Sequence, residues 1–218
     1  MQIIELPARA DDSALERAES QSAMDVLVLP GLDNSGPRHW QTHWEELAGF
    51  RRVDFGDWEK PRLHEWVPAL DRAVRASAHP LVFAAHSLGC LAVAWWASLR
   101  WTAAFAGKVK GALLVAPPDV DVLDASPRIR DFRPSPRLRL PFPTILVASR
   151  NDPYARLEWS QAAAEGWGSR FVDLDAAGHI NAASGLAEWP QGLRLLAELS
   201  GHNPNLLVAE LGLRRALA

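Results

Sequence analysis

Three side chains that could together catalyse acyl transfer each follow a short segment predicted to be a strand. Ser87 comes directly after LVFAAH, Asp152 comes shortly after TILVAS, and His179 comes shortly after FVDLD. A serine hydroxyl is a weak nucleophile at neutral pH, and it becomes effective when a histidine accepts its proton and an acid orients that histidine. The three residues therefore supply a nucleophile, a base and an orienting acid, in the order Ser, Asp, His along the chain.

The residues around Ser87 match a turn that presents a nucleophile. Ala85-His86-Ser87-Leu88-Gly89 corresponds to the nucleophile-elbow pattern G-x-S-x-G, with alanine in the first position. Small residues at both ends allow a strand and a helix to pack closely around a strained turn. Ser87 could instead only cap the helix that follows, because serine is a favoured N-cap residue. The apolar run before it and the apolar helix predicted after it favour the elbow, which needs both.

Other acidic residues could take the place of Asp152. Asp119 follows the apolar run GALLVAP and could also reach a histidine at the same edge of the sheet, so it is the second candidate. Asp173 and Asp175 lie in or at the end of a predicted strand, from which they would reach His179 less easily. We predict Asp152 as the acid, because it and His179 both follow strands whose carboxyl ends meet at one edge of a parallel sheet.

Acyl transfer also requires backbone N–H groups that stabilise the negative charge on the substrate oxygen. The amide of Leu88, directly after the serine, is the first expected donor. The second is expected from the loop PGLDNSG after the run DVLVLP, where we predict Leu32, with Gly31 as the alternative. The same glycine-rich segment could be no more than a tight turn.

A histidine pair and two tryptophans lie in the segment HWQTHW. His39 and His43 are four residues apart, a spacing that places both rings on one face of a helix and suggests a metal site. The zinc motif H-E-x-x-H needs glutamate after the first histidine, where this chain has Trp40, and no third ligand is evident. We therefore predict no metal, and we expect Trp40 or Trp44 to line the substrate pocket. His86 is expected to pack or to form a hydrogen bond, with only a small indirect role.

The elements that must position these residues alternate along the chain. Continuous apolar runs are typical of strands buried on both faces of a parallel sheet, and segments with helical spacing of apolar residues separate them. We predict a three-layer α/β-hydrolase fold with a minimal, mostly parallel sheet, helices on both faces and no large lid domain. The predicted strands are DVLVLPG, RRVDF, LVFAAH, GALLVAPP, TILVASR and RFVDLD, and the predicted helices lie in GPRHWQTHWEELAGF, PRLHEWVPALDRAVRASA, SLGCLAVAWWASLRW, QAAAEGWG and GLAEWPQGLRLLAELS.

The length of 218 residues suffices for one large core, so we predict a single domain over residues 1–218. Residues 1–24 and 201–218 are expected to be peripheral to it. Residues 119–143 are rich in proline, arginine and aspartate and have weak periodicity, which predicts a long excursion over one edge of the sheet. This excursion is expected to help shape the substrate pocket.

Composition argues against several other classes of function. The formal net charge is −3, and no basic run is long enough to form a nucleic-acid surface. Charged residues, glycine or proline interrupt every apolar stretch before it reaches membrane-spanning length. The single cysteine, Cys90, cannot form an internal disulfide, and the first residues lack the pattern of a signal peptide. We therefore expect a cytoplasmic protein that binds a small molecule, and neither nucleic acid nor a membrane.

Four motifs together resemble those of the small α/β-hydrolases of the RBBP9/YdeN serine hydrolase family. They are LPGLDNSGPRHWQTHWE, AAHSLGC, SRNDPY and AGHIN, in this order. The resemblance extends from Val26 to about Leu199, and it implies a triad of Ser87, Asp152 and His179 that acts on esters or small acyl and peptide-like compounds. We expect a carboxylesterase-like serine hydrolase (EC 3.1) that cleaves small esters, thioesters or activated amides through an acyl-enzyme, without a cofactor. The alternative is a protein-binding module of the same fold with weak or no catalysis.

Overall fold

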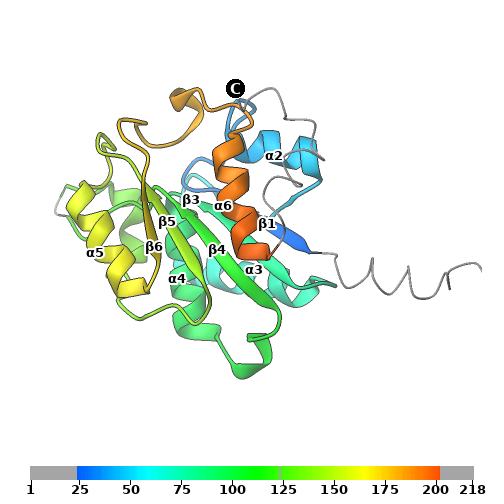
Figure 1. Cartoon of the computed structure of the whole chain (residues 1–218). Helices are drawn as coiled ribbons and strands as arrows, with labels where there is room; N and C mark the ends of the chain where they lie inside the picture. The colour runs from blue at the N-terminus through cyan, green and yellow to red at the C-terminus, as the bar shows by residue number, and fades with distance from the viewer. Residues whose placement is uncertain (1–23, 123, 202–218) are drawn as a thin grey trace, which may run out of the picture.

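The computed structural model describes residues 24–122 and 124–201, which form a parallel sheet with helices packed on both faces (Figure 1). The sheet has six strands in the order β2-β1-β3-β4-β5-β6, and every neighbouring pair is parallel. The strands are β1 (Asp25–Leu29), β2 (Arg51–Arg52), β3 (Leu81–His86), β4 (Val109–Val115), β5 (Thr144–Ala148) and β6 (Arg170–Asp173). The α-helices are α2 (Trp40–Ala48), α3 (Leu63–Ala76), α4 (Leu88–Arg100), α5 (Leu157–Trp167) and α6 (Pro190–Ser200), and the short 3₁₀ helices are η1 (Ala103–Phe105), η2 (Pro127–Phe132) and η3 (Ala182–Ser184).

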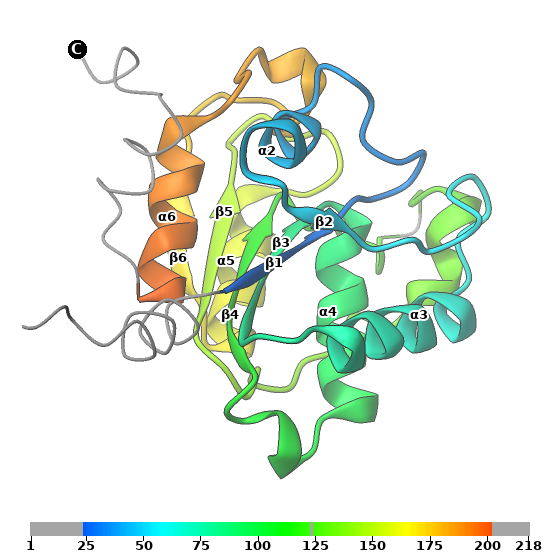
Figure 2. The ribbon, with the colours of Figure 1, turned by 90° about the vertical axis from the view of Figure 1, so that its right-hand side faces the viewer.

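The central strands are continuous apolar runs because both faces of the sheet are covered. Along β3, Leu81, Phe83 and Ala85 pack into the core on one face, whereas Val82 and Ala84 pack into the core on the other. Helices α3, α4 and α5 cover the first face, and α2 and α6 cover the second (Figure 2). This arrangement in three layers confirms the predicted fold class.

The strand order reverses direction between β1 and β3. From β1 the chain moves outward to β2, and it then returns past β1 to form β3 on the other side. The connections that leave β1 and β3 therefore diverge, and open α/β sheets bind their ligands at such a switch point, beyond the carboxyl ends of the strands. The loop after β1 carries Leu32 and the turn after β3 carries Ser87, so both residues lie at this position.

Helix α6 is shorter than predicted. It begins at Pro190 and not at Gly185, because Trp189 has a positive φ of 43° and the proline, which has no N–H, occupies the first helical position. The residues between Gly185 and Trp189 form part of the loop that follows η3.

Residues 119–143 form the long excursion between β4 and β5 that the sequence predicts, with η2 as its regular element. Its helix η2 packs against α4, where Nε1 of Trp95 donates to the carbonyl oxygen of Phe132 at 3.0 Å. Phe132 is fully buried. The apolar residues of the segment, which its many arginines obscure in the sequence, attach it to the core beside the switch point.

Within residues 24–122 and 124–201, no helix combines the length and apolar character needed to cross a membrane. The segments predicted to be peripheral, 1–24 and 201–218, lie outside the described residues except for Met24 and Gly201. The assignment of the whole chain to one domain stays a prediction.

Candidate active site

The turn between β3 and α4 holds Ser87 in a conformation that few residues adopt. Its φ of 52° and ψ of −125° lie outside the regions favoured by L-residues, and such strain persists only where the surroundings enforce it. Gly89 permits the close packing, because a Cβ atom there would overlap the carbonyl oxygen of Leu29. The side chain of Ser87 does not cap α4. Its hydroxyl is therefore available to a partner outside the helix.

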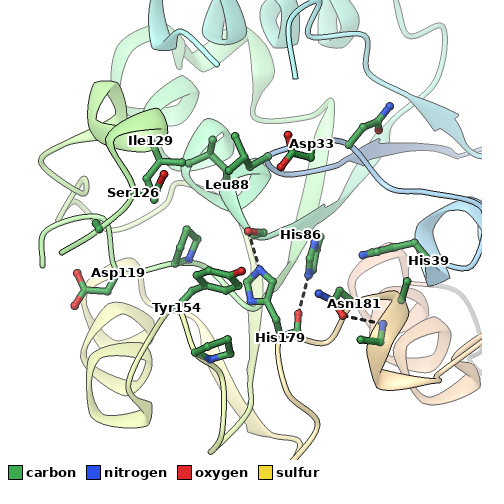
Figure 3. Close-up of a pocket in the computed structure, with 18 of the residues that line it drawn as sticks. Asp33, His39, His86, Leu88, Asp119, Ser126, Ile129, Tyr154, His179 and Asn181 are labelled. Atoms are coloured by element: carbon green, nitrogen blue, oxygen red, sulfur yellow. Dashed lines mark hydrogen bonds between the residues drawn. The ribbon is translucent and has the colours of Figure 1, made fainter. Parts of the chain in front are cut away.

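Ser87, His179 and Asp152 form one continuous chain of hydrogen bonds, although they come from three different connections. Nε2 of His179 lies 2.9 Å from Oγ of Ser87 (Figure 3). Nδ1 of the same ring lies 2.9 and 3.0 Å from the two carboxylate oxygens of Asp152. Because a carboxylate can only accept, Nδ1–H donates to it, which leaves Nε2 free to accept the serine proton. The side chains of His179 and Asp152 are only 9% and 4% exposed.

The loops after β5 and β6 are fastened to each other, which fixes the position of His179 relative to Asp152. Oδ1 of Asn151 accepts hydrogen bonds from the amide that precedes the histidine, at 2.7 Å, and from the hydroxyl of Ser149, at 2.8 Å. Oγ of Ser149 also accepts from the amide of Ala177 at 2.9 Å. In the motif SRNDPY only the aspartate was predicted to act in the site; the supporting residues Ser149 and Asn151, both within this motif, were not predicted.

Trp40 and Trp44 support the histidine loop and do not line the cavity, which corrects their predicted role. They are 1% and 0% exposed and belong to the core between the sheet, α2 and α6. Nε1 of Trp40 donates to the carbonyl of Ile180 at 2.9 Å, and Nε1 of Trp44 donates to the carbonyl of Glu188 at 2.6 Å. Helical spacing in the sequence does not reveal whether a helix borders the cavity; no residue of α2 lines it, and the two rings pack in the core.

His86 and His39 form a row of rings with His179. The ring centroids of His86 and His179 are 4.9 Å apart, and those of His39 and His86 are 4.6 Å apart. Nε2 of His86 donates to the backbone carbonyl of His179 at 2.9 Å, which agrees with the hydrogen bond and indirect role expected for this residue. Nδ1 of His39 accepts from the amide of Gln41 and so caps α2. Burial lowers the pKa of His86 well below its usual value, and burial together with the charge of Arg52 lowers the pKa of His39 to about 3. Both rings are therefore neutral near pH 7.

Leu88 and Leu32, the predicted donors to an oxyanion, both line the cavity at Ser87. Neither backbone amide donates a hydrogen bond within the described part of the chain. A Cβ atom on Gly31 would lie 2.7 Å from Cβ of Ser87 and 3.0 Å from the amide nitrogen of Leu88. The loop after β1 thus approaches the elbow as closely as a glycine allows, and both free amides belong to residues that border the cavity at Ser87.

A cavity of about 720 Å³ opens in front of Ser87 (Figure 3). Its apolar wall includes Leu88, Val122 and Ile129, and it therefore draws on the excursion between β4 and β5. The ring of Tyr154 lines the cavity as well and packs edge-on against the ring of His179, with 4.5 Å between centroids. The volume falls in the range of small-molecule sites, about 300–1,000 Å³.

The other candidate acids have different surroundings. Asp119 lines the cavity, and burial raises the pKa of its carboxyl group. Within the described residues, the His179 ring forms no hydrogen bond with it. Asp173 and Asp175 instead pair with the guanidinium of Arg150, at 2.7 and 3.1 Å.

His39 and His43, the histidine pair of HWQTHW, do not form a metal site together with further ligands among the residues that the structure describes. His39 caps α2 and packs edge-on against His86, whereas His43 lies one helical turn later. In the portion of the chain that the structure describes, no group of three His, Cys, Asp or Glu side chains could hold a metal ion.

Comparison with known proteins adds an independent observation. A sequence model of the family described as Serine hydrolase matches residues 26–198. No curated protein matches the sequence. A solved structure described as that of a YdeN-like hydrolase from Pectobacterium atrosepticum is 31% identical, with a TM-score of 0.71; the match covers 90% of this chain and 99% of that one.

Two further solved structures share the fold at lower identity. The ydeN gene product of B. subtilis is 18% identical, with 82% of this chain and 100% of that chain covered and a TM-score of 0.65. A monoacylglycerol lipase from Paleococcus ferrophilus is 13% identical, with 84% and 95% covered and a TM-score of 0.61. The fold is therefore common to this chain and to proteins that differ widely from it in sequence.

Proposed function

The chain belongs to the serine hydrolase family of RBBP9/YdeN type, and from this premise we propose that Ser87, His179 and Asp152 catalyse the hydrolysis of small esters, thioesters or activated amides. Membership of the family supports hydrolysis. The observation that carries the choice of residues is the unbroken hydrogen-bond chain from Oγ of Ser87 to the carboxylate of Asp152. We class the activity as carboxylesterase-like, EC 3.1.

In the first half of the reaction, Oγ of Ser87 attacks the carbonyl carbon of the substrate while its proton passes to Nε2 of His179. The carbonyl oxygen becomes negative, and the amides of Leu88 and Leu32 donate hydrogen bonds to it. Asp152 stabilises the positive charge on the ring. When the tetrahedral intermediate collapses, Nε2–H protonates the departing alcohol, thiol or amine, and the acyl group remains bound to Ser87.

In the second half, a water molecule takes the place of the leaving group. Nε2 of His179 accepts a proton from the water as its oxygen attacks the acyl carbon, and the same two amides bind the second oxyanion. Collapse of this intermediate breaks the bond to Ser87, whose oxygen regains the proton from the ring. Apart from the substrate and this water molecule, the groups that take part in these steps are side chains and backbone amides of this chain.

The cavity supports a small, partly apolar substrate. Its volume of about 720 Å³ exceeds that of a short acyl chain, and Val122 and Ile129 offer apolar contacts to such a chain. The segment that connects β4 and β5 forms part of the cavity wall beside Ser87 and leaves this residue accessible. No large domain must therefore move before a substrate enters. The expectations of a cytoplasmic location and of no nucleic-acid partner stay predictions of the sequence.

The proposal is tested with p-nitrophenyl esters from acetate to decanoate, using the wild-type protein and Ser87→Ala. We expect turnover by the wild-type protein with a preference for one range of chain lengths. We expect kcat to fall by at least about 10³-fold in the variant, because the nucleophile is lost.

Two results would contradict the proposal. Equal turnover by wild-type protein and Ser87→Ala would show that another group performs the hydrolysis. No turnover of any ester by folded wild-type protein would favour the alternative, a binding module that retains the geometry without catalysis.

A further inference from the structure

One ion pair joins the loop that carries Leu32 to the segment that forms the apolar wall of the cavity. The guanidinium of Arg128 binds both carboxylate oxygens of Asp33: Nη1 lies 3.1 Å from Oδ2, and Nη2 makes a second bond with Oδ1. Nε of the same side chain donates to the carbonyl of Glu59 at 2.8 Å. The side chains of Arg128 and Asp33 are 42% and 56% exposed, and the contacts on two edges of the guanidinium restrict its orientation at this surface.

The Arg128 end of this contact rests on a firm support. Helix η2, which contains Arg128, is anchored by the fully buried ring of Phe132. The carboxylate of Asp131 accepts from the amide of Leu63 at 2.7 Å, and Nε1 of Trp95 donates to the carbonyl of Phe132 at 3.0 Å. The helix is thereby bound to both α3 and α4.

The Asp33 end lies in a strained loop. Asp33 and Asn34 have φ angles of 62° and 64°, in the left-handed region that aspartate and asparagine adopt more readily than other residues with a Cβ atom but less readily than glycine. The backbone of this turn is held by the amide of Asp33, which donates to the carbonyl of Trp58 at 2.9 Å, and by that of Asn34, which donates to the carbonyl of Gly31 at 3.2 Å. Strain of this kind persists only where the surroundings enforce it, and the bidentate contact with η2 is part of those surroundings.

We propose that Arg128 is a positioning residue for the reaction, because through Asp33 it holds the backbone amide of Leu32 where the oxyanion forms. The inference rests on the proposed function, in which this amide binds the negative oxygen. An oxyanion donor acts fully only within hydrogen-bond distance of the developing charge, so a small displacement of the loop weakens it. Ile129, the next residue along η2, belongs to the cavity wall. The position of the donor and the shape of the acyl site therefore depend on the same helix.

The kinetic test compares Arg128→Met with Arg130→Met, which removes an exposed arginine from the same helix. The side chain of Arg130 forms no hydrogen bond or ion pair within the described residues. For the best p-nitrophenyl ester, we expect kcat to fall about 10-fold in Arg128→Met, with KM changed less than about twofold, and both to stay at wild-type values in Arg130→Met. Arg128→Lys keeps the charge without the two-pronged contact and should recover only part of kcat. Asp33→Asn should lower kcat similarly, and the double variant should lower it no further.

A structural measurement makes the test independent of turnover. The amides of Asp33 and Asn34 should exchange their hydrogens about 10-fold faster in Arg128→Met than in the wild-type protein, and at an unchanged rate in Arg130→Met. Wild-type kcat in Arg128→Met, additive losses in the double variant, or unchanged exchange of the two amides would each overturn the inference. If the wild-type protein shows no turnover that depends on Ser87, the proposed function fails, and amide exchange alone then decides whether Arg128 holds the loop.

Discussion

Nε2 of His179 lies 2.9 Å from Oγ of Ser87, although 92 positions separate the two residues in the sequence. They meet because the turn after β3 and the loop after β6 leave the same, carboxyl edge of the parallel sheet. The distance is that of a formed hydrogen bond. The histidine therefore needs no movement before it accepts the serine proton.

Replacement of Asp152 by asparagine is expected to lower kcat by about 10³- to 10⁴-fold without unfolding the protein. An amide nitrogen at this position can donate to Nδ1 of His179, which favours the tautomer whose Nε2 carries the proton and cannot accept another. Hydrolysis of p-nitrophenyl butyrate and the circular dichroism spectrum provide the two measurements. Wild-type kcat in this variant would identify Asp119 as the acid.

Gly31→Ala should reduce kcat/KM by about 100-fold, because the new Cβ atom must displace the loop or the elbow. That atom would lie 2.7 Å from Cβ of Ser87 and 3.0 Å from its Oγ. Gly36→Ala, in the same loop, is the matched control, since a Cβ atom there has no neighbour within 4 Å. Similar kcat/KM values in the two variants would show that the close approach of this loop does not matter for catalysis.

Trp40→Phe removes the donor to the carbonyl of Ile180 and should lower the free energy of unfolding by about 1–3 kcal/mol, because that carbonyl lies beside a fully buried side chain. The substitution should also lower kcat, because Ile180 directly follows His179 in the chain. Trp101→Phe is the control. It makes the same change of side chain, but Nε1 of Trp101 has no hydrogen-bond partner within the described residues. Urea unfolding and ester hydrolysis are measured on both variants. Equal losses of stability and of kcat in the two variants would contradict the role assigned to the hydrogen bond of Trp40.

Acid should destabilise the folded protein through its buried histidines. Burial lowers the pKa of His39 to about 3, from 6.5, so the unfolded chain binds a proton that the folded chain does not. Stability therefore falls as the pH falls below about 6.5 and continues to fall until about pH 3; from pH 7 to pH 5 the loss due to this residue is about 2 kcal/mol. The lowered pKa of His86 adds a loss of the same sign.

The matched variant for this effect is His39→Asn, which keeps a side chain able to cap α2. The difference between its free energies of unfolding at pH 7 and pH 5 should be smaller than that of the wild-type protein. Urea titrations at the two pH values give both numbers. An identical pH dependence in the two proteins would mean that His39 is not held neutral in the folded state.

The sequence was sufficient to predict the sheet and the convergence of the three reactive groups. Strands buried on both faces need continuous apolar runs, as β3 and β5 show, and parallel strands present all their carboxyl ends at one edge. Ser87 and Asp152 each follow such a strand, and His179 follows the short edge strand β6. The strained elbow could also be predicted, because its small flanking residues are close in the sequence.

The supports of the site could not be predicted in the same way. Trp40 was expected in the pocket, but its ring turns away and bonds to Ile180, 140 positions later. The contact between Asp33 and Arg128 spans 95 positions. No periodicity or local motif encodes such pairs, because they depend on how loops from different strands pack over one another.

Labelling with a fluorophosphonate, followed by mass spectrometry of the digested protein, tests the central claim most directly. We predict one phosphonyl adduct on the peptide that contains Ser87, and no adduct in Ser87→Ala. Folded wild-type protein that remains unlabelled, or that carries the adduct at another residue, would contradict it.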